Sequence, residues 1–178
     1  MSKVLVILGE LSDRDIDWMI SNGSKEKITT DTILINEGQP IDALYIVIEG
    51  KLKAYIAALG DKEIGIVSSG EVLGEMSFVD GHLPSATVKA IEDSLILSIS
   101  KQKLNDKLEK DVLFSLRFYR AITKFLSTRL RGTVSRFSDE QELLYPDDHN
   151  NEKTEFIWDN SAVAQSRFEF LMHRLKAD

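Results

Sequence analysis

The middle of the chain, from about Thr32 to Ser100, is divided into short apolar runs by glycine and acidic turn residues, and this pattern restricts the fold most. The runs are Thr32–Ile35, Leu44–Ile48, Leu52–Ala57, Glu63–Val67, Thr87–Ala90 and Ser94–Ile99. Short strands that follow one another roughly every 8 to 12 residues are typical of a β-sandwich or barrel. We therefore predict a mainly β fold, a jelly-roll-like β-roll flanked by helices.

The N-terminal section, to about Thr30, has helical periodicity instead. Ile16, Met19 and Ile20 recur at i, i+3 and i+4 behind the cap residue Ser12. Asn22-Gly23 ends this pattern. One N-terminal helix is predicted before the roll.

After Lys101 the period is helical again, and residues 112–137 contain no proline. Apolar residues follow one another there at steps of three and four: Val112, Leu116, Tyr119, Ile122, Leu126, Leu130, Val134 and Phe137. This stripe is longer than one small roll can cover. We predict that half of it packs on the roll and half on a second copy, which makes a homodimer. The alternative is that the whole stripe belongs to the core of one chain.

The C-terminal part changes composition. Residues 139–155 carry seven acidic residues against one lysine, and Pro146 interrupts any helix, so we predict a solvated linker. A last helix is predicted from Ser161, with an apolar face that docks on the body or on a partner protein. The predicted organisation is 1–111 for the roll with its N-terminal helix, 112–137 for the long helix, 138–160 for the acidic linker and 161–178 for the docking helix.

Between Gly70 and Thr87 the strand pattern fails, and two signatures occupy this region. Gly74-Glu75-Met76-Ser77-Phe78 predicts a short helix that begins at a glycine, and Pro84-Ser85-Ala86-Thr87-Val88 follows it. With Glu37-Gly38 and residues 44–50 upstream, the chain resembles the cyclic-nucleotide-binding domain family over about residues 11–137. That family includes bacterial catabolite-activator-type regulators, kinase regulatory subunits and gated channels. The resemblance implies a stand-alone bacterial-type domain without a DNA-binding domain.

The resemblance also assigns ligand-binding residues. In the family, the cassette that matches Gly74 to Ser77 holds the cyclic phosphate, and the glutamate matching Glu75 accepts a hydrogen bond from the ribose 2′-hydroxyl. Ser85 matches a small residue that touches a phosphate oxygen, and a threonine of the dimer helix that reaches the purine matches Thr133. The candidate ligand-binding residues are Gly74, Glu75, Met76, Ser77, Ser85, Ala86, Thr87 and Thr133.

One position departs from the family pattern. Members that bind cyclic nucleotides tightly carry an arginine just before the small residue, whereas Pro84 stands there in this chain. A guanidinium forms one of the strongest single contacts to a phosphate, and proline has neither charge nor N–H. Residues 63–88 contain no lysine or arginine, and His82 is the one residue of the loop that could carry a positive charge.

Composition excludes several other functions. The chain has no cysteine, so a disulfide scaffold, a thiolate metal site and a cysteine nucleophile are excluded. Its three histidines, His82, His149 and His173, fall in a loop, the acidic linker and the last helix, which does not suit a metal site or a catalytic residue on the roll. The net charge of −7 disfavours nucleic acid as a partner. No apolar run approaches a membrane span, and we expect a cytoplasmic protein that is not an enzyme and needs no cofactor.

Two functions remain after these exclusions. In the first, the chain is a regulatory protein that senses a cyclic nucleotide or a related phosphate ligand and signals through the dimer helix and tail to a partner protein. In the second, it is a ligand-free scaffold for protein interaction. A scaffold predicts that Pro84, Leu83 or Phe78 fills the space that a ligand would take.

Overall fold

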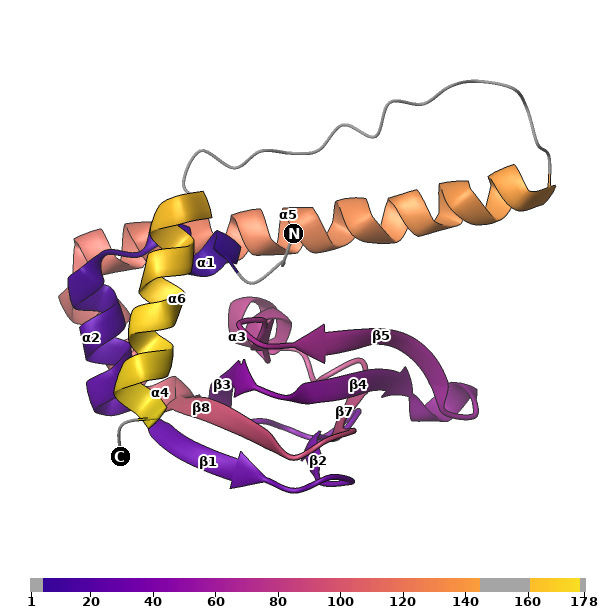
Figure 1. Cartoon of the computed structure of the whole chain (residues 1–178), viewed down its shortest axis with the longest axis horizontal. Helices are drawn as coiled ribbons and strands as arrows, with labels where there is room; N and C mark the ends of the chain where they lie inside the picture. Colours follow the sequence, from indigo (N-terminus) through magenta and orange to yellow (C-terminus); the bar gives the residue numbers. More distant parts are fainter. Residues whose placement is uncertain (1–4, 145–160, 177–178) are drawn as a thin grey trace.

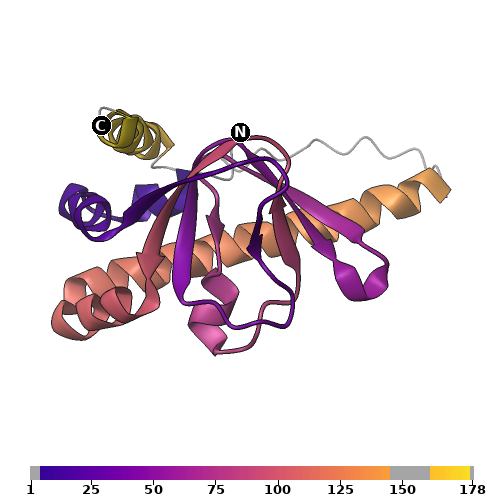
Figure 2. The same cartoon turned by 90° about the horizontal axis from the view of Figure 1, so that it is seen from below.

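The computed structural model describes residues 5–144 and 161–176, with side chains described for 7–135 and 162–176. Two four-stranded antiparallel sheets pack against each other (Figures 1 and 2). One sheet has the order β1 (Ser24–Ile28), β8 (Ser94–Ser100), β3 (Ala43–Glu49) and β6 (Val72–Leu73). The other has the order β2 (Ile33–Ile35), β7 (Thr87–Ala90), β4 (Lys51–Ile56) and β5 (Lys62–Ser68). The predicted β-roll is confirmed.

The central strands of the first sheet are apolar on both faces, which explains their nearly continuous apolar sequence. Successive side chains of a strand point to opposite faces. In β3, Ile46 and Ile48 face the core that the sheet shares with the helices, whereas Val47 faces the second sheet. In β8, Leu97 faces the core shared with the helices and Ile96 faces the second sheet. The first sheet therefore separates two hydrophobic cores.

The helices form one layer against the first sheet. α1 (Leu5–Glu10) and α2 (Asp13–Asn22) precede the roll, and α4 (Lys101–Lys110) leads into α5 (Val112–Leu144). Side chains on one side of α5 fill the space between the helix and the roll: Phe114, Phe118, Ala121, Ile122 and Phe125. Figure 2 shows that α5 passes across the whole width of the roll. A short helix, α3 (Glu75–Asp80), lies between α5 and the sheets, where Phe78 packs edge-on against Phe118.

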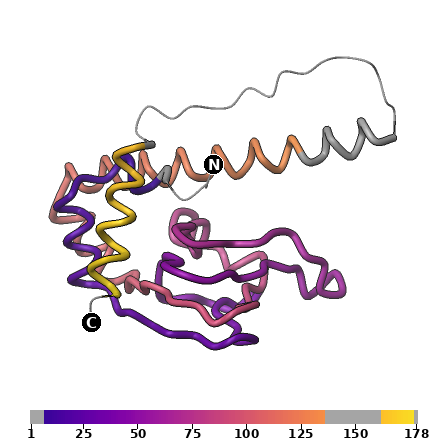
Figure 3. Tube along the Cα trace, viewed as in Figure 1, coloured from indigo at the N-terminus to yellow at the C-terminus, as the bar shows by residue number. Residues whose placement is uncertain are grey.

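The last helix, α6 (Ser161–Lys176), lies beside α1 and α2, so the first and last helices of the chain pack together (Figures 1 and 3). Leu171 and Leu175, two residues of the predicted apolar face, are buried together with Ala164, whereas Val163 of that face is 46% exposed. Arg167 fixes its position, because its guanidinium donates to the carbonyl oxygens of Leu8 (3.0 Å) and Gly9 (3.3 Å) at the end of α1.

Three details differ from the sequence-based expectations. β1 lies in the section expected to be helical, because its five residues pair with β8 along their whole length. β6 occupies two residues of the region expected to be a helical turn, and pairs with β3. α5 continues to Leu144, so residues 138–144 are helical rather than linker, and residues 145–160 of the expected linker lie outside the described residues.

In the described segments, 5–144 and 161–176, no helix has both the length and the apolar character that a membrane span requires.

Candidate functional site

The cassette begins at Gly74, where the backbone turns from β6 into α3. Gly74 has φ 83°, a left-handed conformation that favours glycine. A Cβ at this position would lie 2.8 Å from Ile41 Cδ1 and 3.0 Å from the carbonyl oxygen of Ala43. Both the turn and the close approach to β3 therefore require glycine. This turn places the next residue, Glu75, inside the molecule.

Glu75 is the most buried polar side chain of the cassette, with 2% of its surface exposed. Arg129 of α5 forms an ion pair with its carboxylate. Burial raises the pKa of Glu75, and the neighbouring carboxylate of Glu71 adds to this effect, while Arg129 and a backbone hydrogen bond oppose it. A hydrogen-bond donor that binds this carboxyl group must displace Arg129 or join it.

Arg129 connects the cassette to α5. Besides Glu75, its guanidinium donates to the carbonyl oxygen of Val72 in β6 (3.3 Å) and lies over the ring of Phe125, 4.6 Å from the centroid. About a third of the side chain, 33%, remains exposed. One arginine therefore contacts β6, α3 and the aromatic core of its own helix.

The other two residues of the α3 signature lie on different sides of the helix. Ser77 is buried, and its carbonyl oxygen accepts from the N–H of Gly81. Met76 is 48% exposed and faces away from the interior. The structure therefore brings Glu75 and Ser77 into the interior and leaves Met76 on the surface.

The second signature follows in the loop between α3 and β7. Ser85 is exposed, Ala86 is half-buried and Thr87 is buried at the start of β7. Thr87 Oγ1 accepts a hydrogen bond from the N–H of Glu37 (3.1 Å), and Pro84 accepts through its carbonyl oxygen from Gly38 (2.8 Å). The Glu37-Gly38 motif therefore holds this loop in place.

Charge at the cassette comes from the long helix rather than from the loop. Pro84 supplies no cation, and His82 is 82% exposed and lies 3.4 Å from Asp80, so the His82 side chain faces solvent. Within the part of the chain that the structure describes, the cation that pairs with a cassette carboxylate is Arg129. The sequence motifs did not identify this residue, although its position one helical turn before Thr133 could have indicated it.

Thr133 is exposed on α5, one turn beyond Arg129, and its hydroxyl donates to the carbonyl oxygen of Arg129 (3.1 Å). It does not contact the cassette within this chain. Its place on the helix is nevertheless next to the ion pair, on the boundary between the roll-facing side and the exposed side.

The scaffold hypothesis names three residues, Leu83, Phe78 and Pro84, as those that would occupy the ligand space. Leu83 is 55% exposed, and Phe78 packs against Phe118 in the helical core. Pro84 is half-buried at the base of the loop.

The opposite side of α5 presents exposed apolar residues. Val112, Leu116 and Leu130 are 77%, 67% and 65% exposed, and Tyr119 and Val134 continue the stripe. Ile122, which the sequence pattern placed in the same stripe, is buried against the roll instead. Leu126 is partly buried beside Ile122, and the Phe137 side chain lies outside the described ones. Most of the predicted stripe is therefore exposed, and the residues that pack on the roll, such as Phe114 and Phe118, did not belong to it.

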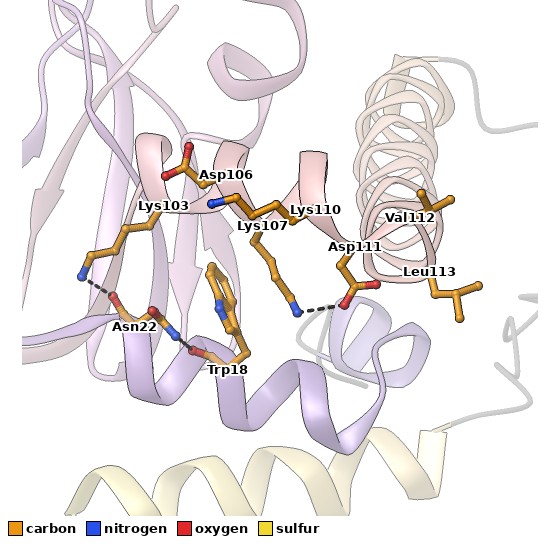
Figure 4. Close-up of a pocket in the computed structure, with 9 residues that line it drawn as sticks. All are labelled: Trp18, Asn22, Lys103, Asp106, Lys107, Lys110, Asp111, Val112 and Leu113. Carbon is orange, nitrogen blue, oxygen red and sulfur yellow. Dashed lines mark hydrogen bonds and ion pairs between the residues drawn. The ribbon is translucent and has the colours of Figure 1, made fainter.

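A separate pocket of about 580 Å³ lies between α2, α4 and the start of α5 (Figure 4). Trp18 and Asn22 of α2 face Lys103 and Lys107 of α4 across it, and Leu113 lies at one end. Lys103 donates to the carbonyl oxygen of Asn22 (3.0 Å). None of the candidate ligand-binding residues lines this pocket.

The central part of the chain matches a known domain family. A sequence profile described as "Cyclic nucleotide-binding domain" matches residues 25–111. An uncharacterized NTE family protein of Mycobacterium tuberculosis is 24% identical over 121 residues, 67% of this chain and 20% of that protein. The chain therefore spans about a fifth of that relative's length. The cyclic AMP receptor protein of Thermus thermophilus is 28% identical over 94 residues, 52% of this chain and 44% of that protein.

Solved structures agree with the fold. The structure of a cyclic nucleotide-binding domain from Methylobacillus flagellatus superimposes with a TM-score of 0.69 at 19% sequence identity and covers 85% of each chain.

Proposed function

Because residues 25–111 of this chain form a cyclic nucleotide-binding domain, we propose that the protein is a regulatory protein that senses a cyclic nucleotide or a related phosphate ligand. The observation that carries the proposal is the buried carboxylate of Glu75 at the start of α3. A buried carboxylate is costly unless it has partners, and the resemblance assigns this one to a ribose hydroxyl.

The Glu75–Arg129 pair supports a mechanism for signalling. A ribose hydroxyl that donates to Glu75 competes with Arg129 for the same carboxylate oxygens. The ligand therefore weakens the ion pair that joins the cassette to α5. This shifts the population of α5 positions relative to the roll. The signal needs no chemical step, and we propose that the chain is not an enzyme.

The exposed apolar side of α5 supports the proposed homodimer. Val112, Leu116 and Leu130 recur at intervals that are sums of three and four residues, the spacing of a two-helix seam. A change in the position of α5 alters how the two copies of the chain pack against each other. We propose that the docked α6 transmits this change to a partner protein.

The second candidate function, a ligand-free scaffold, is favoured by one observation. Pro84 replaces the family arginine, and no other cation of the loop faces the cassette in the described residues. Against it, Leu83 is exposed and Phe78 packs in the helical core, so neither has the position that the scaffold hypothesis predicts.

Calorimetric titration separates the two functions. The full chain is titrated with cyclic AMP and cyclic GMP, beside Glu75→Ala and the matched control Glu63→Ala, which replaces an exposed glutamate on β5. A sensor gives saturable binding that Glu75→Ala weakens at least tenfold and the control leaves unchanged. No heat at millimolar concentrations of either nucleotide overturns the proposal of a cyclic mononucleotide sensor.

A further inference from the structure

Three lysines of α4 line the pocket between α2, α4 and the start of α5. Lys103, Lys107 and Lys110 recur at i, i+4 and i+7, so they lie on one face of the helix. Like charges at this spacing repel one another. Lys103 also lies in the first turn of α4, where the helix dipole disfavours a cation. The stability of α4 therefore does not account for a row of cations that begins at Lys103.

Two of these lysines keep their positive charge available at the pocket. Lys110 is exposed and forms no ion pair with any residue that the structure describes. Lys103 donates to the carbonyl oxygen of Asn22 (3.0 Å), an uncharged acceptor. Lys107, in contrast, forms an ion pair with Asp111 (2.8 Å). Within segments 5–144 and 161–176, Lys103 and Lys110 therefore have no carboxylate partner.

Apolar surface and one further hydrogen-bond donor lie beside these cations. Figure 4 shows the Trp18 ring pointing from α2 toward α4, and its centroid lies 5.5 Å from that of Phe114. The indole N–H has no hydrogen-bond partner among the described residues. It is open to solvent, because no buried side-chain N or O atom of those residues lacks a partner. Leu113, 65% exposed, also lines the pocket and is not a member of the stripe proposed for the homodimer.

The pocket is open rather than enclosed. Most of the residues that line it are exposed: Lys103, Asp106, Lys110, Val112 and Leu113. Sites for small molecules usually bury most of the surface of their ligand. An open site that combines cations with an apolar ring suits a segment of a larger molecule, which continues beyond the pocket. The net charge of −7 and the carboxylate of Asp106 disfavour a nucleic-acid backbone in that role.

We propose that this pocket is a docking site for an acidic segment of a partner protein, whose carboxylates bind Lys103 and Lys110 and whose apolar side chain packs on Trp18. Charge complementarity determines the kind of partner. The lysines and the indole N–H are donors, and of the two carboxylates in the pocket Asp111 is already paired with Lys107. The inference goes beyond the proposed sensor and does not depend on nucleotide binding, since none of the candidate ligand-binding residues lines the pocket.

Trp18 can report docking by its own fluorescence. The chain has two tryptophans, so Trp158→Phe leaves Trp18 as the single indole. This full-length variant is titrated with a synthetic peptide that repeats the unit Glu-Glu-Leu, beside a matched peptide that repeats Gln-Gln-Leu. We expect a saturable change in Trp18 emission with the acidic peptide, and at least tenfold weaker binding of the neutral one. Added salt should weaken binding of the acidic peptide, because it screens exposed charges.

Two charge reversals in the same background separate the pocket from the overall charge of the protein. Lys110→Glu should weaken binding of the acidic peptide at least tenfold. The variant should fold, because Lys110 is exposed and has no ion pair with a described residue, and a thermal melt checks this. Lys62→Glu, at an exposed position of β5, makes the same change in net charge and should bind the peptide as its parent does.

Several results would overturn the inference. One is no change in Trp18 emission at millimolar concentrations of the acidic peptide. Equal binding of the two peptides, or equal weakening by Lys110→Glu and Lys62→Glu, would show that the charge of the pocket has no role. A single-stranded oligonucleotide that binds more tightly than the acidic peptide would assign the pocket to nucleic acid. Tighter peptide binding after Asp147→Asn and Asp148→Asn would assign it to acidic residues of this chain itself.

Discussion

The guanidinium of Arg129, well along α5, donates a hydrogen bond to the buried carboxylate of Glu75, 54 residues earlier at the start of α3. This pair joins the element that carries the candidate ligand contacts to the element that carries the exposed apolar stripe. Any ligand that binds Glu75 acts on both, which gives the fold a direct route from cassette to long helix.

The Glu75–Arg129 pair predicts a pH dependence of stability. Burial raises the pKa of Glu75 in the folded state, so folding disfavours its ionised form. The contribution of Glu75 to the free energy of unfolding is therefore largest below its ordinary pKa and falls as the pH rises through the raised one. Arg129→Ala removes an opposing charge and should make this fall steeper. Urea unfolding between pH 4 and 8 measures it.

Arg14→Ala, at an exposed position of α2, serves as the control for that series. Its stability should change with pH as that of the wild type does. If the free energy of unfolding of Arg129→Ala also follows the pH curve of the wild type, the proposed electrostatic coupling between Arg129 and Glu75 is contradicted.

Asp15 and Arg117 predict the opposite pH dependence. Burial by itself raises the pKa of Asp15, but hydrogen bonds from Arg117 (2.6 and 2.9 Å) and Ser12 outweigh it and lower the pKa. This stabilisation is present above the unfolded pKa and is lost as the pH falls through the folded one. Asp15→Asn should cost roughly 1.5–3 kcal/mol at neutral pH, the range for hydrogen bonds to charged groups.

In urea unfolding, the difference between Asp15→Asn and the wild type should shrink below about pH 4, near the ordinary pKa of aspartate. Asp17→Asn, half-exposed and 3.7 Å from Arg174, is the control and should change the free energy of unfolding little. A difference for Asp15→Asn that is independent of pH would contradict the assignment.

Gly74 and Gly60 both have a left-handed backbone conformation, so Gly60 serves as a control for Gly74. Both have positive φ, 83° and 69°, but of the two only Gly74 has atoms within 4 Å of the position that a Cβ would take. Gly60→Ala should cost about 1–2 kcal/mol through backbone strain alone. Gly74→Ala should cost clearly more, because the added methyl meets the backbone of Ala43. Equal losses in denaturant midpoints would show that the close approach to β3 is unimportant.

Leu130 tests the proposed homodimer. It is 65% exposed in the middle of the apolar stripe, so Leu130→Glu should leave the fold intact and separate the copies. Sedimentation equilibrium measures the mass, and circular dichroism checks the helix content. Ser135→Glu, exposed but away from the stripe, should stay dimeric. A wild-type chain that sediments as a monomer contradicts the dimer directly.

The fold was predictable because its signals are local. The six apolar runs correspond to β2, β3, β4, β5, β7 and β8. The period of α5 predicted the helix but not its buried side, because both sides carry apolar residues and the predicted stripe followed mainly the exposed one. β1 was missed because Ser24-Lys25-Glu26-Lys27-Ile28 carries no apolar run and is a strand only through its pairing with β8. At the site, the Gly74–Glu75 turn was predictable from the motif. The partner of Glu75 was not, because tertiary packing brings Arg129 to it over 54 residues.

Hydrogen exchange of the full chain, with and without saturating cyclic AMP, tests the coupling of cassette and long helix most directly. We predict changed protection in two separate places, at α3 with the loop 81–86 and along α5 around Arg129, while β1 stays as it was. Changes confined to the cassette would contradict a signal that passes from Glu75 to Arg129. No change in either place would contradict the nucleotide site itself.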